Sequence, residues 1–144
     1  MTDITRLIVA TPEATQDIAA LVAQLSSDAP APSQADLAAI LASPTNDMLI
    51  AQSEGVIIGM TTLVTIRTAT GSRCFIDDVV VLDSHRGQGL GEALIQAAIR
   101  LARDHGAKKI DLTSRPSREA ANRLYRRLGF VLRDTNAYRL VLTT

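Results

Sequence analysis

Hydrophobic residues recur with two different spacings along the chain, and each spacing predicts one type of element. Alternating or continuous short apolar runs between turn residues predict β-strands, whereas a recurrence every three or four residues predicts helices. Strands are expected at residues 4–10, 48–53, 56–67, 73–82, 108–114, 130–134 and 137–142. Helices are expected at residues 12–25, 34–41, 92–105 and 118–128.

The order of these elements predicts a mixed sheet. A hairpin turning at Glu54–Gly55 and the strand after it indicate antiparallel pairing, and the helix at residues 92–105 then leads to a crossover strand. A final hairpin around Thr135–Asn136 is expected to close the sheet. The fold class is therefore α/β (α+β), with a mostly antiparallel central sheet flanked by helices. A chain of 144 residues with 47% hydrophobic content is expected to form a single domain, residues 1–144.

Residue types at the helix ends support these boundaries. Thr11 and Pro12 are typical of a helix start, and Ser33 and Ser117 are expected to cap the second and fourth helices. Glycines follow the third and fourth helices, where their tolerance of a positive φ suits a helix end.

Charge, cysteine and histidine content exclude several classes of protein. Fifteen basic and fifteen acidic residues cancel, which argues against a nucleic-acid-binding protein. Cys74 is the only cysteine, so an intrachain disulfide and a cysteine zinc site are excluded, and it is expected to be a buried strand residue. His85 and His105 lack the spacing of metal ligands, so both are interpreted as structural or solvated and no metal is expected.

The apolar runs also bear on location. No run of about 18 apolar residues is present, so no membrane span is expected. The first ten residues contain an acid and lack an apolar signal core, so a cytoplasmic location is the expectation. A homodimer is left open.

The stretch HRGQGLGEAL, residues 85–94, places three alternating glycines between a strand and a helix. The first turn of a helix has unpaired N–H groups and the positive end of the helix dipole, and glycines let a ligand approach the backbone closely. The pattern therefore predicts a phosphate or pyrophosphate site. The alternative is a turn that needs glycine only for its dihedral angles.

Two common phosphate motifs do not fit this loop. A Walker loop requires Lys followed by Ser or Thr after its last glycine, and none is present. A dinucleotide-binding loop has the spacing G-x-G-x-x-G in a parallel βαβ unit, whereas Gly87, Gly89 and Gly91 are evenly spaced after predicted hairpins.

Three stretches resemble the GNAT superfamily of N-acetyltransferases. Arg86-x-x-Gly89-x-Gly91 is similar to the R/Q-x-x-G-x-G/A motif that wraps the pyrophosphate of acetyl-CoA. DDVVVLDSHRGQGLG resembles the fourth strand and its loop, and SREAANRLYRRLGF resembles the last helix with its A-x-x-x-Y-x-x-x-G-F pattern, from Ala121 to Phe130. The element order agrees from about residue 4 to the end, which implies a GNAT fold whose fourth and fifth strands splay apart.

The resemblance implies acetyl-CoA as co-substrate. Val79, Val80 and Val81 would offer backbone groups to the pantetheine arm, as a strand edge offers them to a peptide. The pyrophosphate would lie on the loop and the first helical turn, with Arg86 nearby. The implied phosphate-binding residues are Gly87, Gln88, Gly89, Leu90, Gly91 and Glu92.

Tyr125 occupies the place of the family's tyrosine that hydrogen-bonds the cofactor sulfur. A thiol has a pKa of about 8.5 and a phenol of about 10, so the hydroxyl would help by a hydrogen bond that strengthens as thiolate charge develops. The alternative is a tyrosine that only packs on the core. Arg118 stands where many members have a cofactor-binding asparagine, and arginine could still bind a phosphate. Neighbouring arginines either serve the 3′-phosphate of CoA or are solvated.

Asp77 and Asp78 are consecutive acids in an apolar strand. Neighbours on a strand point to opposite faces, so one acid is expected to face the cleft. An alkylammonium must lose a proton before it attacks a thioester, and a carboxylate can hold it and take that proton, directly or through water. The alternative is an ion pair with Arg67 or Arg73.

These features predict an N-acetyltransferase that moves the acetyl group of acetyl-CoA directly to a primary amine on a small molecule or peptide. Direct transfer is favoured because Cys74, the only thiol, is remote from the loop. The first two helices and the final hairpin, with Asn136 and Tyr138, are expected to line the acceptor side. A non-catalytic acyl-CoA sensor and another acyl donor stay open, and missing phosphotransfer motifs argue against a nucleotide-dependent transferase.

Overall fold

The computed structural model describes residues 2–143, which divide into two compact parts. The first part ends at Thr113 and the second begins at Ser114. The single domain expected from the sequence stays a prediction.

The first part is built on a five-stranded sheet with the strand order β1-β2-β3-β4-β5. Neighbours from β1 to β4 are antiparallel, and β4 and β5 are parallel. This confirms the mixed sheet and the hairpin between β2 and β3. The strands are β1 Ile4–Arg6, β2 Asn46–Ser53, β3 Val56–Thr68, β4 Gly71–Val81 and β5 Ile110–Asp111.

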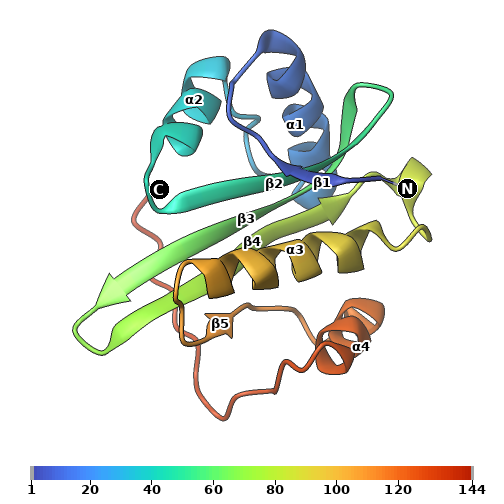
Figure 1. Ribbon diagram of the computed structural model, residues 1–144. Helices are drawn as coiled ribbons and strands as arrows, with labels where there is room; N and C mark the ends of the chain where they lie inside the picture. Colours follow the sequence, from blue (N-terminus) through green and yellow to red (C-terminus); the bar gives the residue numbers. More distant parts are fainter. Residues whose placement is uncertain (1, 144) are drawn as a thin grey trace. The chain divides into compact units, whose positions relative to one another are not determined.

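Helices cover both faces of this sheet (Figure 1). On one face, α1 and α2 bury Ile18, Leu21 and Leu37 against Met48 and other apolar residues of the strands. On the other face lies α3, whose Leu90 packs in a cluster with strand residues. The helices of this part are α1 Pro12–Leu25, α2 Gln34–Ala42, the short 3-10 helix η1 Asp83–His85, and α3 Leu90–Asp104.

Close approach of α3 to the sheet depends on Gly59. A Cβ at this position would lie 3.3 Å from Leu94 Cδ1 and 3.4 Å from the carbonyl oxygen of Val80. The first distance is tighter than most side-chain contacts, so a larger residue here would require Leu94 of α3 to shift.

The predicted caps of α1 and α2 are confirmed. Thr11 Oγ1 accepts a hydrogen bond from the N–H of Ala14, and Ser33 Oγ accepts one from the N–H of Asp36. The Asp36 carboxylate accepts in return from the N–H of Ser33, which completes a capping box and lowers the pKa of Asp36.

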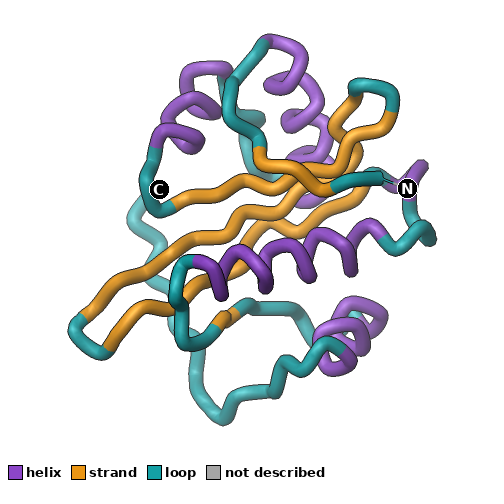
Figure 2. The backbone as a smooth tube through the Cα atoms, in the orientation of Figure 1, coloured by secondary structure: helices purple, strands orange, loops and turns teal. Residues whose placement is uncertain are grey.

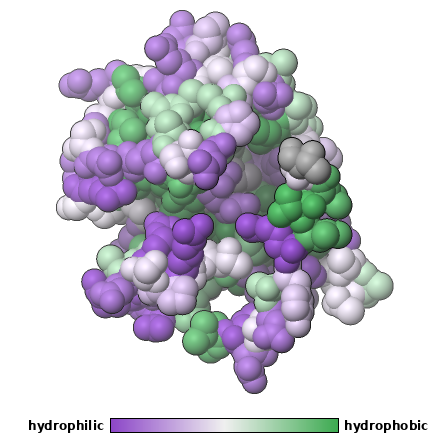
Figure 3. Space-filling model, turned by 180° about the vertical axis from the view of Figure 1, so that it is seen from behind, coloured by the Kyte–Doolittle hydropathy of each residue, from purple (hydrophilic) through white to green (hydrophobic). Residues whose placement is uncertain are grey.

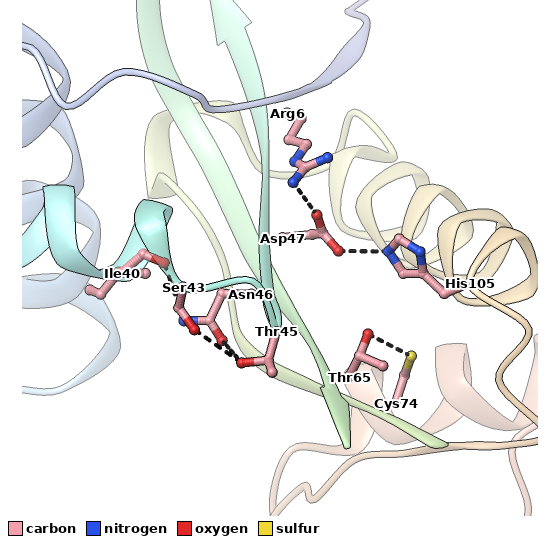
Figure 4. Close-up of polar contacts among 9 residues, drawn as sticks. All are labelled: Arg6, Ile40, Ser43, Thr45, Asn46, Asp47, Thr65, Cys74 and His105. Atoms are coloured by element: carbon pink, nitrogen blue, oxygen red, sulfur yellow. Dashed lines mark hydrogen bonds and ion pairs between the residues drawn. The ribbon is translucent and has the colours of Figure 1, made fainter. Parts of the chain in front are cut away.

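The carboxyl-terminal end of α3 is held to the sheet by a buried carboxylate (Figure 4). Asp47 of β2 lies 2.8 Å from Arg6 NH2 and 2.8 Å from His105 Nε2 through its two oxygens. Its side chain is only 6% exposed, so it needs these partners. The interpretation of His105 as a structural residue is confirmed, and buried Cys74 in β4 is confirmed as well.

Two of the predicted strands are shorter than expected. The strand predicted at residues 4–10 ends at Arg6, because Ile8 and Val9 leave the sheet and are 75% and 63% exposed. The strand predicted at residues 108–114 keeps only Ile110–Asp111, where it pairs with β4.

The second part contains one helix, α4 Glu119–Arg127, among its described residues. The prediction of Ser117 as its cap is wrong, because the N-cap is Arg118, whose side chain makes no capping bond. Gly129 has a φ of +103° just beyond the helix, as a helix end requires.

The predicted final hairpin is wrong in this structure. Residues 130–143 form no strand, and Figure 2 shows the chain after α4 as loop. Strands need a neighbour for their backbone groups, and no strand of the described chain pairs with this segment. Hydrophobic residues accordingly reach the surface (Figure 3). The most exposed hydrophobic residues of this segment are Val131, Leu132, Tyr138, Leu140 and Leu142, between 83% and 91% exposed.

Candidate functional site: a splayed strand edge and a glycine loop

A β-bulge interrupts β4 at Asp78. Thr62 pairs with Asp77 and Met60 pairs with Val80, so two residues of β4 lie opposite the single residue Thr61. Asp78 has a φ of +55°, in the left-handed region that is unusual for a residue other than glycine. A bulge bends a strand and increases its twist, and here it follows the last residue that pairs with β5.

Beyond the bulge, one edge of β4 has no strand beside it in the described chain. The parallel pairing with β5 covers only Cys74 and Phe75. The splayed fourth and fifth strands expected from the sequence are therefore present.

Backbone groups at this open edge alternate in direction. Leu82 donates to the carbonyl of Ile58 in β3, so the alternation of an antiparallel ladder turns the backbone of Val80 toward β3 and that of Val81 outward. The carbonyl of Val79 shares a peptide group with the N–H of Val80 and therefore points outward as well. The Val81 carbonyl already accepts a hydrogen bond from Gln24. Of the three predicted pantetheine-binding valines, Val79 with its carbonyl and Val81 with its N–H thus face the open edge.

The glycine loop leaves space above the start of α3. Gly87 and Gly89 have φ values of +80° and +75°, which explains glycine at both positions. Gly91 has no positive φ, and a Cβ placed on Gly87, Gly89 or Gly91 would meet no atom within 4 Å. Neither dihedral angle nor packing within the described chain requires glycine at position 91, so the open space fits close approach of a ligand to the backbone.

The first turn of α3 is suited to an anion. Its N-cap is Gly89, which has no side chain to accept from the first-turn N–H groups. Leu90 is buried and fixes the turn to the sheet, whereas Gln88 is exposed beside it. Glu92 is an acid in the first turn, which the helix dipole stabilises. Arg86 is exposed and pairs with Asp83 at 2.9 Å, so a basic group stands at the entrance of the loop.

Asp77 and Asp78 both lie exposed at the bulge. The sequence analysis assumed a regular strand, in which these two neighbours would point to opposite faces of the sheet. The bulge interrupts that alternation. Asp77 is the register partner of Thr62, and Thr62 pairs with Met48, so Asp77 lies on the sheet face that carries α1 and α2. The Asp77 carboxylate accepts from the N–H of Asp78 at 3.0 Å.

Electrostatics at the bulge favour a proton or a cation. Although the residue is exposed at the surface, the surrounding protein partly desolvates its carboxyl group, and this desolvation, followed by the nearby Asp77 charge, raises the pKa of Asp78 above its ordinary value. The alternative of an ion pair with Arg73 is not seen, because Arg73 lies 3.8 Å from Asp111 instead. Among residues 2–143, no ion pair involves either acid of the bulge.

In the second part, Tyr125 is the buried residue of α4, with 7% of its surface exposed. Its ring meets Phe130 edge to face, with ring centroids 5.9 Å apart. Burial raises the pKa of Tyr125, and the positive charge of Arg118 opposes that rise. The hydroxyl therefore stays protonated at neutral pH and can donate a hydrogen bond.

The second part is basic, although the whole chain is neutral. Seven arginines lie between Ser114 and the end, against the two acids Glu119 and Asp134. Arg118 is exposed at the start of α4, where a phosphate would be favoured by both its charge and the helix dipole.

One polar residue of this region was missed by sequence reasoning. Gln24, near the end of α1, bonds to the backbone at the end of β4. A glutamine on the polar side of a helix carries no sequence signal for such a contact. In the part of the chain that the structure describes, no group of three or more His, Cys, Asp or Glu is placed to hold a metal, and no helix is long and apolar enough to cross a membrane.

Curated relatives are acetyltransferases. N-alpha-acetyltransferase 30 of Schizosaccharomyces pombe is 31% identical over 86 residues, which cover 54% of this chain and 57% of that protein. N-acetyltransferase family 8 member 2 of Rattus norvegicus is 30% identical over 102 residues, which cover 67% of this chain and 45% of that protein. The chain therefore spans about half the length of these relatives.

Solved structures share the fold over nearly the whole chain. An acetyltransferase of Trypanosoma brucei has a TM-score of 0.80 at 27% identity, covering 99% of this chain and 100% of that one. An aminoglycoside N-acetyltransferase in complex with CoA has a TM-score of 0.81 at 21% identity, covering 99% and 96%.

The model of the acetyltransferase (GNAT) family matches residues 15–130. The matched range includes the bulged strand, the glycine loop and the tyrosine helix. The chain belongs to the GNAT family of acetyltransferases.

Proposed function

We propose that the protein is an N-acetyltransferase that transfers the acetyl group of acetyl-CoA directly to a primary amine in a ternary complex. The observation that carries this proposal is the open edge of β4 leading into the glycine loop at the start of α3. Together they offer amide-binding groups and then an anion-binding turn, in the order that pantetheine and pyrophosphate require.

In this proposal both parts of the chain belong to one catalytic domain, residues 1–144. The family model supports it, because its match runs from residue 15 to residue 130 and so includes both parts. Val79 and Val81 bind the pantetheine amides, and the loop amides with Arg86 bind the pyrophosphate. Arg118 serves a phosphate of the same ligand.

The acids of the bulge prepare the acceptor. Acetyl-CoA supplies an electrophilic thioester carbonyl when it is bound. Asp77 lies on the face of α1 and α2, and Asp78 has a raised pKa, so the pair attracts an ammonium and accepts its proton, directly or through water. The neutral amine nitrogen then forms the bond to the carbonyl carbon as the carbon–sulfur bond breaks.

Tyr125 stabilises the negative charge that develops on the leaving sulfur. Its hydroxyl is protonated at neutral pH and donates a hydrogen bond to the sulfur as negative charge develops there. The amine nitrogen loses a proton as the amide forms, and that proton, carried by water, converts the leaving sulfur to the thiol of CoA. Because a phenol is a weaker acid than a thiol, the hydrogen bond, rather than full proton loss from Tyr125, supplies the help.

Direct transfer is supported by the position of the only thiol. Cys74 is fully buried in β4, where its Sγ lies 3.6 Å from Thr65 Oγ1 (Figure 4). A buried thiol without access to the ligand cannot carry the acetyl group in a covalent intermediate.

Two acceptor classes follow from the relatives. The yeast relative is an N-alpha-acetyltransferase and one solved structure is an aminoglycoside N-acetyltransferase. An amine on a peptide end and an amine on a small molecule are therefore the first acceptors to test.

The experiment is CoA-thiol release from acetyl-CoA with a panel of polyamines, amino sugars, amino acids and short peptides, and with acetyl-CoA affinity measured by calorimetry. Amine-dependent release with intersecting double-reciprocal plots is expected. Parallel plots would contradict direct transfer. Binding without release across the panel would favour an acyl-CoA sensor, and an equal rate with succinyl-CoA would contradict the choice of acetyl donor.

A further inference from the structure

Gln24 bridges α1 and the end of β4 with both atoms of its side-chain amide. Its Nε2 donates to the carbonyl of Val81 at 2.7 Å, and its Oε1 accepts from the N–H of Asp83 at 2.9 Å. One donor and one acceptor thus serve two backbone groups that are separated by a single residue. A residue of a neighbouring strand would bind the same two groups in the same way.

This contact lies where the open edge of β4 becomes the glycine loop. The carbonyl of Val81 belongs to the last residue of β4, and the N–H of Asp83 belongs to the first residue of η1. The amide of Gln24 therefore ends the open edge at Val81. It leaves the preceding groups of the edge for a ligand.

The same contact reaches the arginine of the loop through Asp83. The Asp83 carboxylate lies 2.9 Å from Arg86 NH2, and the Asp83 carbonyl accepts from the N–H of Arg86 at 3.3 Å. A continuous series of polar contacts thus runs from α1 through Asp83 to Arg86. Each member lies in the first part of the chain.

We infer that Gln24 is a positioning residue for acetyl-CoA binding. It holds the end of β4 and the start of the loop at a fixed spacing, so that the strand edge and the loop amides face the ligand together. The inference rests on the proposed function, and it adds a residue of α1 to the determinants of cofactor affinity.

Gln34 offers a matched comparison. Its Nε2 donates to the carbonyl of Ala10 at 2.8 Å, so it too is a helix glutamine bound to a backbone carbonyl. It holds the chain before α1, and no side-chain hydrogen bond links it to the end of β4 or to the loop among residues 2–143. If Gln24 only held a helix in place, as Gln34 does, replacing either glutamine would have the same effect on acetyl-CoA affinity.

The test measures acetyl-CoA affinity by calorimetry for the wild type, Gln24→Ala, Gln24→Glu and Gln34→Ala, with urea unfolding of each. Loss of two hydrogen bonds at the junction is expected to weaken binding by Gln24→Ala about tenfold. Gln24→Glu keeps the size and an acceptor but loses the donor for Val81, so it is expected to bind weakly too and serves if the alanine variant does not fold. Gln34→Ala is expected to keep wild-type affinity.

Kinetics separate positioning from general loss of structure. With a verified acceptor, the Gln24 variants are expected to raise KM for acetyl-CoA and to leave kcat and the acceptor KM unchanged. Equal affinities for Gln24→Ala and Gln34→Ala, or losses that only follow the unfolding midpoints, would overturn the inference. If the wild type binds no acetyl-CoA, the proposed function fails and the inference fails with it.

Discussion

Nε2 of His105 lies 2.8 Å from Oδ2 of Asp47, so the end of α3 is tied to β2 through a carboxylate that is almost fully buried. Arg6 binds the other oxygen. Asp47→Ala removes the carboxylate that Arg6 and His105 share and leaves both side chains without this partner. The free energy of unfolding is expected to fall by about 1–3 kcal/mol, measured by urea denaturation.

Cofactor binding should be insensitive to this change. The glycine loop lies at the other end of α3, about 22 Å away for a helix of 15 residues. Asp104→Ala removes an exposed aspartate beside His105 and is the control, with an expected change within about 0.5 kcal/mol. Equal unfolding midpoints for both variants would show that the buried contact contributes nothing.

Gly91→Glu tests the anion site without backbone strain. Gly91 has no positive φ and no atom lies near its Cβ position, so the substitution should leave the fold intact, and an acid in the first turn suits the helix dipole. A carboxylate where a pyrophosphate docks should weaken acetyl-CoA binding by about a hundredfold or more, measured by calorimetry.

Gly91→Ala is the matched control for this site. It should raise the free energy of unfolding by about 0.5–1 kcal/mol, because alanine loses less backbone entropy than glycine in a helix. Its affinity should stay near that of the wild type. A folded Gly91→Glu variant with unchanged affinity would remove the loop from the binding site.

Tyr125→Phe keeps the ring that packs on Phe130 and removes only the hydroxyl. The kcat is expected to fall by about a hundredfold, whereas the affinity for acetyl-CoA should change little. Since burial raises the pKa of Tyr125 above the ordinary phenol value of 10.0, the wild-type rate should show no loss from tyrosine ionisation below that pH. An unaltered kcat with a verified acceptor would rule out the role at the sulfur.

Asp78→Asn tests the bulge, because asparagine tolerates the left-handed backbone of this position. The raised pKa means that the folded protein binds this proton more tightly than the unfolded chain. Wild-type stability is therefore lost as the pH rises from 3.8 through the raised value. The variant should be more stable than the wild type at pH 7, and this difference in stability should vanish at pH values below the ordinary aspartate pKa of 3.8.

The same substitution should lower kcat/KM by about tenfold or more, because a proton acceptor is removed. Urea unfolding across pH and initial rates at pH 7 measure the two effects. Glu54→Asn replaces an acid at another left-handed position, φ +51°, and controls for the backbone effect of asparagine. If the free energy of unfolding of Asp78→Asn differed from that of the wild type by the same amount at every pH, a raised pKa of Asp78 would be contradicted.

Much of the first part could be predicted because its signals are local. The turn at Glu54–Gly55, the caps Thr11 and Ser33 and the apolar spacing of the helices each depend on residues a few positions apart. The alternating glycines are a local signal of the same kind, and the anion site that they indicate stays a prediction.

Features that depend on distant partners were not predictable in this way. Gln24 contacts a carbonyl 57 residues away, and no local pattern reports it. The bulge at Asp78 depends on the register with β3, so the assumption of a regular strand failed there. The alternation at residues 130–142 is a strand pattern, but a strand forms only beside a neighbour, and the described chain provides none.

The bulge also determines how far β4 can pair with β5. A chain without Asp78 would keep Asp77 opposite Thr62 and Val80 opposite Met60, and β4 would be regular. Nothing would then bend β4 away from β5, and parallel pairing could continue past Phe75. The protein's own backbone would then compete for the strand groups that the proposed function assigns to the pantetheine arm. One additional residue in β4 thus decides whether its edge pairs with β5 or keeps backbone groups free to bind a ligand.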